Sequence, residues 1–261
     1  MVEQCRTLDN LRAIHELKAV LCYPSMDPEC AVQRAVELSM LGVHSLCLVG
    51  SVELGSLRVI GKGTTSLVVK GLARSGVVAV KIRRTDANRV SLLREARILE
   101  SVKELGVGPR IRCASRNFLV WDFINGVDFA EWVEKVASRE ELETVLEKLL
   151  TKLFLLDQHG IVHAELSQPS NHILVDLERL EPVLVDFESA SLDSQKSNLT
   201  QFMGFLVNKG NPLSEKLRKS LGLDDPLKIE NLKKLLKAYK LSRDSESFRE
   251  ILDYFKASII T

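Results

Sequence analysis

The stretch His163-Ala164-Glu165-Leu166-Ser167 is followed by Asn171-His172-Ile173-Leu174-Val175 and then by Val183-Leu184-Val185-Asp186-Phe187-Glu188. Together these residues predict a loop that carries a carboxylate and an amide, a short strand, a turn, and a second strand that ends in an aspartate. Such an order can place one acid near a phosphoryl acceptor and another acid on a magnesium ion. The three stretches therefore point to a phosphotransferase site, and the rest of the chain is interpreted from them.

The length, composition and net charge of the chain limit the class of protein. The 261 residues, 45% of them hydrophobic, suffice for one two-lobed domain or two small domains. Because 36 basic residues nearly balance 35 acidic ones, net charge attracts the chain neither to nucleic acid nor to a membrane. The sequence has no apolar run of about 20 residues and no signal-peptide pattern, so we expect a cytoplasmic protein without membrane contact.

The five cysteines bear on the redox state of the protein. They are an odd set without a C-x-x-C pair. Such a set is typical of reduced thiols, and we expect neither a disulfide framework nor a zinc site.

The first part of the chain is expected to be helical. Apolar residues recur at helical spacing over residues 8–22. After a break, Asp27 can cap a second helix that has Pro28 at its first position. We therefore expect a helical N-terminal extension over residues 1–50.

Strands and then helices follow. Runs of β-branched residues predict strands over residues 57–60, 66–73 and 77–83. Helical patterns predominate later, with helices expected over residues 129–136 and 140–159. This order predicts an α+β fold, with a small β-rich lobe over residues 51–124 and a helical lobe over residues 125–261.

A glycine turn, Gly61-Lys62-Gly63, separates the first two of these strands. Glycines at such a turn let backbone N–H groups approach phosphate oxygens closely, and Val68 follows in the next strand. A Rossmann site needs a helix after the turn, and a P-loop needs Ser or Thr after the lysine, so neither pattern fits. An ordinary hairpin turn is the alternative explanation.

Lys81 ends the apolar strand pattern Val77-Val78-Ala79-Val80. An ammonium group at the rim of a buried strand can neutralise nucleotide phosphates, and a glutamate on a helix can hold it in place. Glu95 is the best candidate partner, because apolar neighbours suggest that its helix face turns inward. The alternative is a lysine and a glutamate that are both solvated.

The loop and the strand end offer the acidic groups. Glu165 can orient an acceptor hydroxyl, whereas we expect His163 to pack as a structural histidine. Asn171 or His172 can hold a divalent ion, and Asn171 is preferred because magnesium favours oxygen ligands. Asp186 is well placed to bind magnesium, although a capping aspartate at the strand exit is the alternative.

With these motifs in this order, the chain resembles the protein kinase-like superfamily. The loop Glu165-Leu166-Ser167 and the segment Asp186-Phe187-Glu188 resemble the atypical RIO kinases and an archaeal group of predicted serine/threonine kinases. The resemblance covers residues 57–192. It implies a bilobal fold that binds ATP between its lobes.

The resemblance also implies a role for each candidate residue. The cofactor-binding residues would be Gly61, Lys62, Gly63, Val68, Lys81, Glu95, Asp122 and Phe123, the last two at a hinge that meets the adenine. Lys81 would hold the phosphates, Glu165 would orient the nucleophile, and Asp186 with Asn171 would bind Mg²⁺. No A-P-E-like segment follows Asp186, so the usual activation segment is expected to be missing.

Two alternatives to an active kinase or ATPase that phosphorylates an unidentified protein acceptor follow from the sequence. Five departures from the kinase pattern favour a pseudokinase that uses nucleotide binding as a switch: Ser66, Ala164, Glu165, the displaced Asn171 and Glu188. Residues 209–240 carry nine basic residues against four acidic ones, which favours contact with RNA or a ribosome. A solvated helix face is the simpler explanation of that excess.

Overall fold

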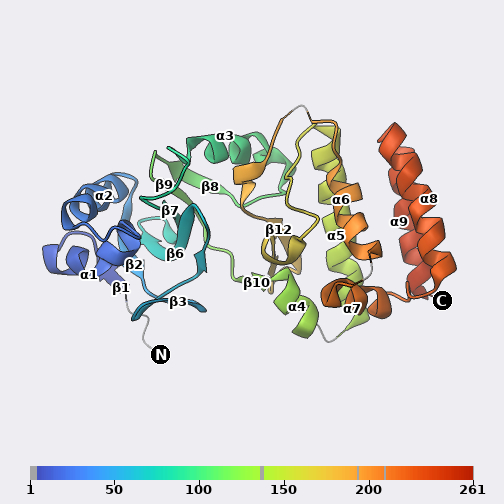
Figure 1. Cartoon of the computed structure of the whole chain (residues 1–261), viewed down its shortest axis with the longest axis horizontal. Coiled ribbons are helices and arrows are strands. Elements are labelled where there is room, and N and C mark those ends of the chain that lie inside the picture. Colours follow the sequence, from blue (N-terminus) through green and yellow to red (C-terminus); the bar gives the residue numbers. More distant parts are fainter. Residues whose placement is uncertain (1–4, 136–137, 193, 209, 261) are drawn as a thin grey trace. The chain divides into compact units, whose positions relative to one another are not determined.

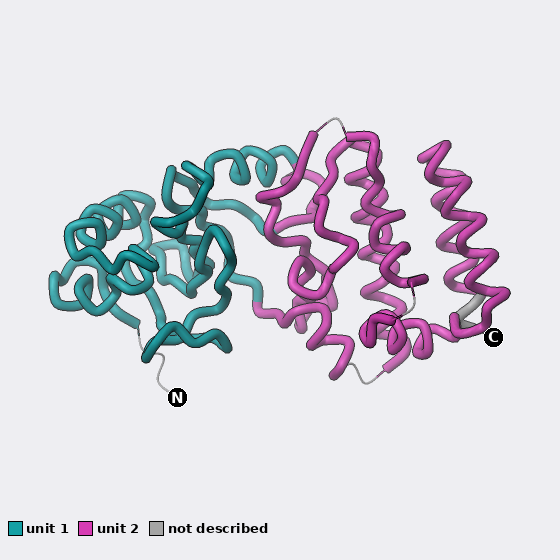
Figure 2. The backbone as a smooth tube through the Cα atoms, in the orientation of Figure 1, with its two compact units in different colours: residues 1–101, 109–124 teal, residues 102–108, 125–261 magenta. Residues whose placement is uncertain are grey.

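The computed structural model describes residues 5–135, 138–192, 194–208 and 210–260. The chain forms two compact units (Figure 2). Unit 1 comprises Met1–Ser101 and Pro109–Ile124, and unit 2 comprises Val102–Gly108 and Asn125–Thr261. An antiparallel sheet dominates the first unit and helices dominate the second, which confirms the expected α+β class. The predicted division at residues 1–50, 51–124 and 125–261 stays a prediction.

Unit 1 is built on an antiparallel sheet with the strand order β1-β2-β6-β7-β9-β8 (Figure 1). In addition, β5 pairs with β6. Its strands are β1 (Cys5–Thr7), β2 (Val43–Cys47), β3 (Val52–Leu54), β4 (Leu57–Val59), β5 (Gly61–Lys62), β6 (Ser66–Ala73), β7 (Gly76–Arg83), β8 (Ile111–Ala114) and β9 (Phe118–Asp122). Its helices are α1 (Leu11–Leu21), α2 (Pro28–Met40) and α3 (Leu93–Ser101). The hairpin of β3 and β4 forms a separate two-stranded sheet.

The two N-terminal helices begin where the sequence predicts them. The Asn10 side chain accepts hydrogen bonds from two backbone N–H groups of α1, and Asp27 caps α2 with Pro28 at the first helical position. Their buried apolar faces share one core with the sheet, for example Leu17 with Val80. Because β1 and β2 also extend that sheet, residues 5–47 form part of the same hydrophobic core as the strands that follow.

The expectation of reduced thiols is wrong for four of the five cysteines. The structure contains the disulfides Cys5–Cys47 and Cys22–Cys30, and only Cys113 remains a thiol. Cys5 and Cys47 are direct partners in the register of β1 and β2, so the fold brings together residues that are 42 apart in sequence. A search for C-x-x-C spacing cannot detect such a pair.

Unit 2 contains a small antiparallel sheet, β10-β11-β12, among helices. Its strands are β10 (Gly126–Asp128), β11 (Ile173–Asp176) and β12 (Glu181–Leu184), and its helices are α4 (Phe129–Lys135), α5 (Arg139–Gln158), α6 (Asn198–Val207), α7 (Pro212–Ser220), α8 (Pro226–Ser242) and α9 (Ser245–Ile260). Short 3₁₀ turns are η1 (Lys103–Leu105), η2 (Pro169–Asn171) and η3 (Phe187–Ser189). Val136, the expected end of α4, lies outside the described residues. Among the described helices, none has the length and apolar character needed to span a membrane.

Gly126 shows why β10 begins with glycine. A Cβ atom built at Gly126 would lie 2.4 Å from the Val175 carbonyl oxygen of β11. No side chain fits at that distance, so the close approach of the two strands requires glycine at this position.

Candidate functional site: a lysine–glutamate pair and an acidic loop

Lys81 and Glu95 form a buried ion pair in unit 1. The Lys81 Nζ atom donates to Glu95 Oε1 at 2.9 Å and to Oε2 at 2.8 Å, and the two side chains are only 4% and 5% exposed. Lys81 lies on the central strand β7, and Glu95 lies on the inward face of α3. The structure therefore brings together the two residues that the sequence analysis paired. Their role toward a nucleotide stays a prediction.

The glycine segment lies one strand away from Lys81. Val68 of β6 is the register partner of Lys81 on one side and of Gly61 on the other. Gly61 and Lys62 belong to β5 and are not themselves the turn, because the Gly63 N–H group closes the hairpin on the Ser66 oxygen at 2.8 Å. The expected turn is thus displaced toward residues 63–66, and a strand follows it, as predicted.

The fold itself does not demand glycine at these positions. A Cβ atom at Gly61 would approach Val68 to 3.7 Å, and a Cβ atom at Gly63 would approach Ser66 to 3.6 Å, which are ordinary contacts. Gly63 is therefore not explained by crowding within unit 1. A close approach of phosphate oxygens to this backbone is one reason for glycine here, and that role stays a prediction.

Asp122 and Phe123, the predicted hinge residues, have their backbone donors engaged. The Asp122 N–H group donates to the Arg110 oxygen at 3.0 Å, and the Phe123 N–H group donates to the Val77 oxygen at 3.4 Å. The Asp122 carboxylate pairs with Arg112. Any backbone hydrogen bond between these two residues and an adenine would therefore use their carbonyl groups as acceptors.

The hairpin of β11 and β12 sets the positions of the metal-binding candidates in unit 2. Ile173 pairs with Leu184, and the Val185 N–H group then donates to the His172 oxygen at 2.9 Å. Asn171 and His172 thus precede one strand, and Asp186 follows the other, at the same end of the hairpin. Antiparallel register brings these residues together although they are far apart in sequence.

Two backbone positions in this region are strained. Ala164 has a φ angle of 78°, and Asp186 has a φ angle of 64°. Residues other than glycine rarely adopt positive φ angles, which cost on the order of 1 kcal/mol or more each and cluster at functional sites. One strained residue immediately precedes Glu165, and the other is itself a candidate ligand.

His163 lies at the centre of the acidic loop. Its side chain is fully buried, its Nε2 atom donates to the Val185 oxygen at 2.8 Å, and its ring packs edge-on against Phe187. Burial, and secondarily the charge of His172, lowers the pKa of His163 from 6.5 to about 4. This confirms the packed role expected for the residue.

Two acidic residues influence the pKa of the His163 imidazole. Asp186 and Glu165 both act on the pKa of His163, in the direction that raises it. Electrostatic influence of this kind falls off with distance, so both carboxylates are close enough to His163 to act on the pKa of its ring. Glu165 and Asp186 therefore share His163 as an electrostatic neighbour, and their joint role in a site stays a prediction.

The oxygen donors of this region fit a hard cation such as Mg²⁺, which prefers carboxylate and amide oxygens. Asn171 is exposed and Asp186 is half-buried. By contrast, the Nδ1 atom of His172 is buried and has no hydrogen-bond partner among the described residues. The oxygen preference of Mg²⁺ favours Asn171, whereas the orphaned Nδ1 atom of His172 keeps that residue as the alternative ligand.

Sequence reasoning missed a buried network beneath the loop. Asp157, at the end of α5, accepts hydrogen bonds from the Ser197 hydroxyl at 2.6 Å, the Asn198 side-chain amide at 2.8 Å and the Tyr239 hydroxyl at 3.0 Å. The side-chain oxygen of Asn198 in turn accepts a hydrogen bond from the backbone N–H group of His163 at 2.9 Å. The network ties the acidic loop to α5, α6 and α8. Nothing in the local sequence around Asp157 marks it.

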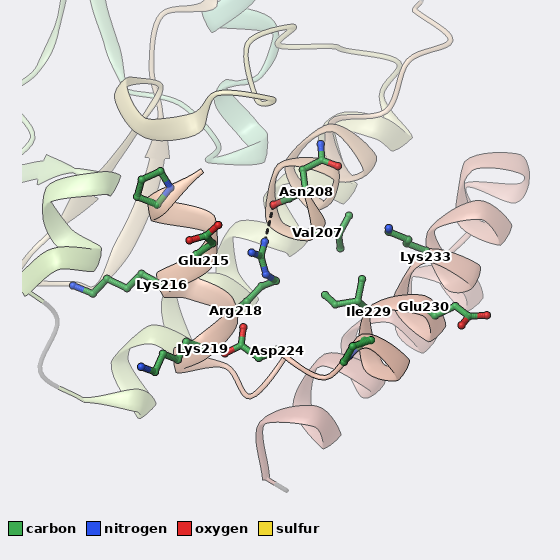
Figure 3. Close-up of a pocket in the computed structure, with 12 residues that line it drawn as sticks. Val207, Asn208, Glu215, Lys216, Arg218, Lys219, Asp224, Ile229, Glu230 and Lys233 are labelled. Atoms are coloured by element: carbon green, nitrogen blue, oxygen red, sulfur yellow. Dashed lines mark hydrogen bonds between the residues drawn. The ribbon is translucent and has the colours of Figure 1, made fainter. Parts of the chain in front are cut away.

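A separate pocket of about 960 Å³ lies among α6, α7 and α8 (Figure 3). The charged residues that line it are Lys216, Arg218, Lys219, Lys233, Glu215, Asp224 and Glu230. Arg218 points to the end of α6, where its guanidinium donates to the Leu206 and Asn208 oxygens, both at 2.7 Å. Because both signs of charge line the pocket and Arg218 closes a helix end, it is not a simple phosphate site.

A sheet unit with a buried lysine–glutamate pair and a helical unit with an acidic loop and a strand-end aspartate define a protein kinase-like protein. The family model of the RIO domain matches residues 69–204, just over half of the chain. The chain therefore belongs to the RIO family, an atypical protein kinase-like family, which confirms the resemblance. A search of curated proteins found no match to the chain.

Proposed function

We propose that this protein binds Mg-ATP and transfers its terminal phosphoryl group, slowly, to a serine or threonine of a protein acceptor or to water. The observation that carries the proposal is the buried ion pair of Lys81 and Glu95. Family membership supports a kinase-like ATP-binding protein. The phosphoryl-transfer reaction and the acceptor go beyond family membership and are proposed here.

The energetics of the pair support a role beyond folding. Taking two charges out of water costs several kcal/mol per ion, and apolar residues of similar volume are often as stabilising or more so. A pair that is 4% and 5% exposed is therefore a poor device for stability alone. A lysine held in a fixed position by a glutamate is what neutralisation of nucleotide phosphates requires.

The acidic loop supplies the other roles. We assign Glu165 to orient the acceptor hydroxyl and Asp186 with Asn171 to hold Mg²⁺. When bound, the ion would neutralise charge on the phosphates. Positioning and charge neutralisation account for most of the catalysis of phosphoryl transfer, so a longer glutamate in place of the usual aspartate is compatible with slow turnover.

The segment that follows Asp186 indicates what kind of acceptor the protein could bind. It passes through η3, and Ser191 bridges to Val162 before α6 begins at Asn198. This connection is short, which supports our proposal that a separate peptide-binding activation segment is missing. The acceptor would then be a folded surface or a flexible tail rather than a peptide laid on such a segment.

ATP turnover with an aspartate variant tests the proposal. In Asp186→Asn, we expect release of phosphate and autophosphorylation to fall at least about 100-fold, because a charged metal ligand is lost. Asp176→Asn is the matched control. Asp176 lies at the other end of the same hairpin and caps the turn through the Glu178 and Arg179 N–H groups, which an asparagine oxygen can also accept. If Asp186→Asn turns over ATP as fast as Asp176→Asn and the wild type, the proposal is rejected.

A nucleotide-binding pseudokinase is the first alternative. The strained Ala164, which replaces the usual arginine of the loop, is the feature that favours it. A rise in melting temperature with Mg-ATP but no turnover would support this alternative, because ligand binding stabilises the folded state whether or not chemistry follows.

Contact with RNA is the second alternative, and one face of α8 favours it. Lys233, Lys237 and Lys240 are exposed at helical spacing, and none of them forms a salt bridge among the described residues. Lys209, part of the same basic region, lies outside the described residues. RNA affinity that falls steeply with salt would support this contact, and affinity that does not change with salt would exclude it. The ribosome contact and the cytoplasmic location likewise stay predictions.

A further inference from the structure

Tyr23 is the point at which the N-terminal helices meet the glycine segment of unit 1. The residue follows Cys22, the C-cap of α1. The Lys62 Nζ atom lies 5.0 Å from the centre of the Tyr23 ring, and the Arg84 Cζ atom lies 4.9 Å from it. Both distances are within the range of an attractive cation–π interaction.

These two cations belong to the glycine hairpin and to the strand end beside it. Lys62 is part of β5. The Arg84 guanidinium donates to the Gly63 oxygen at 2.9 Å, and the Arg84 N–H group donates to the Thr65 oxygen at 2.8 Å. The Tyr23 ring therefore contacts both ends of the segment 61–66, one directly and the other through Arg84.

Tyr23 itself is firmly held. Its carbonyl oxygen accepts from the Thr85 N–H group at 2.8 Å and from the Thr85 hydroxyl at 3.1 Å. On the side of α1, the preceding Cys22 is bonded to Cys30 of α2. Arg34 of α2 also donates to the Leu21 oxygen and, at 2.7 Å, to the Arg83 oxygen. The ring is thus a fixed surface against which the hairpin can rest.

We propose that Tyr23 is a positioning residue for nucleotide binding, because its ring restrains the glycine segment 61–66 through Lys62 and Arg84. This inference rests on the proposed function, in which that segment faces the phosphates. Loss of the ring removes both cation–π contacts and loosens the hairpin, although Arg84 keeps its ion pair with Asp86 and its bond to the Gly63 oxygen. Binding of ATP then becomes weaker, whereas the chemical step at Glu165 is unaffected.

Hydrogen exchange of the nucleotide-free protein gives a test that does not depend on ATP. The probe is the Gly63 amide, which closes the hairpin on Ser66. In Tyr23→Leu we expect this amide to exchange about five-fold faster, the factor that corresponds to about 1 kcal/mol. Amides of the β7–β9 ladder serve as the internal control and should be unchanged. Tyr23→Phe keeps the ring, and we expect it to exchange like the wild type.

A second variant keeps the hydrogen-exchange test usable if Tyr23→Leu does not fold. Arg84→Leu removes one cation and the bond to the Gly63 oxygen but leaves Tyr23 and its contacts with Thr85 in place. We expect the Gly63 amide to exchange faster in this variant too. If exchange is unchanged in every variant that folds, the inference is wrong, whatever the protein does with ATP.

Nucleotide binding then separates positioning from general stability. In Tyr23→Leu we expect the KM for ATP to rise about five-fold with kcat changed less than about two-fold, and we expect Tyr23→Phe to restore the wild-type KM. A lower kcat with an unchanged KM would overturn the inference. Faster exchange in a protein that binds no nucleotide would support the restraint of the hairpin by Tyr23 while rejecting the proposed function.

Discussion

The pair of Lys81 and Glu95 yields a prediction in which stability and function change in opposite directions. In Glu95→Gln, the Lys81 ammonium would lose the carboxylate that accepts its hydrogen bonds at 2.8 and 2.9 Å. Removal of one partner of a buried pair costs about 3–5 kcal/mol. For a chain of this size, that loss lowers the melting temperature by roughly 10 °C.

Replacement of both partners gives the opposite result for stability. The side chains are nearly unexposed, so Lys81→Met combined with Glu95→Leu fills the same space with apolar groups. Such replacements range from neutral to about 4 kcal/mol more stable. We therefore expect the double variant to unfold at or above the wild-type temperature. Mg-ATP binding should nevertheless weaken about 10- to 100-fold, because hydrogen bonds to a charged group are worth about 1.5–3 kcal/mol.

The assays are thermal unfolding followed by circular dichroism and calorimetric titration with Mg-ATP. The control is the pair of Lys152 and Glu181 in unit 2, which are 2.6 Å apart and 10% and 34% exposed. Its double replacement, Lys152→Met with Glu181→Leu, should leave Mg-ATP affinity unchanged. A Lys81/Glu95 double variant less stable than Glu95→Gln, or one that binds Mg-ATP like the wild type, would refute the reasoning.

Three further predictions concern unit 2. Burial lowers the pKa of His163 from 6.5 to about 4, so the free energy of unfolding is highest above pH 6.5 and falls by up to about 3 kcal/mol as the pH drops toward 4. Urea unfolding at a series of pH values should show this loss in the wild type but not in His163→Gln. Glu165→Gln should lower turnover at least about 100-fold while calorimetric ATP affinity stays constant, and unchanged turnover would remove Glu165 from the mechanism. Gly126→Ala should destabilise unit 2 by more than about 2 kcal/mol in urea unfolding, since its Cβ atom would collide with the Val175 oxygen.

Local features of the molecule followed from the sequence. The strand over residues 66–73 is found as β6, and α2 begins at the predicted cap and proline. The pairing of Lys81 with Glu95 was also foreseen, because an inward helix face could be recognised from its apolar neighbours. Periodicity and capping report on a few adjacent residues, and these features depend on little else.

Features set by tertiary pairing were not foreseen. Gly61 and Lys62 are strand residues because the register with β6 continues past the expected turn. Cys5 meets Cys47 only because β1 joins the sheet beside β2. Asp157 draws its donors from residues 40 to 82 positions away, and no local pattern encodes that distance.

The metal dependence of ATP binding tests the central claim most directly. Calorimetric titration of the wild type with ATP should show affinity at least about ten-fold higher with Mg²⁺ than with EDTA, and Asp186→Asn should abolish that difference. Should the wild type bind ATP equally well with and without the ion, or should Asp186→Asn keep the full effect of Mg²⁺, the assignment of a Mg-ATP site to this protein would be contradicted.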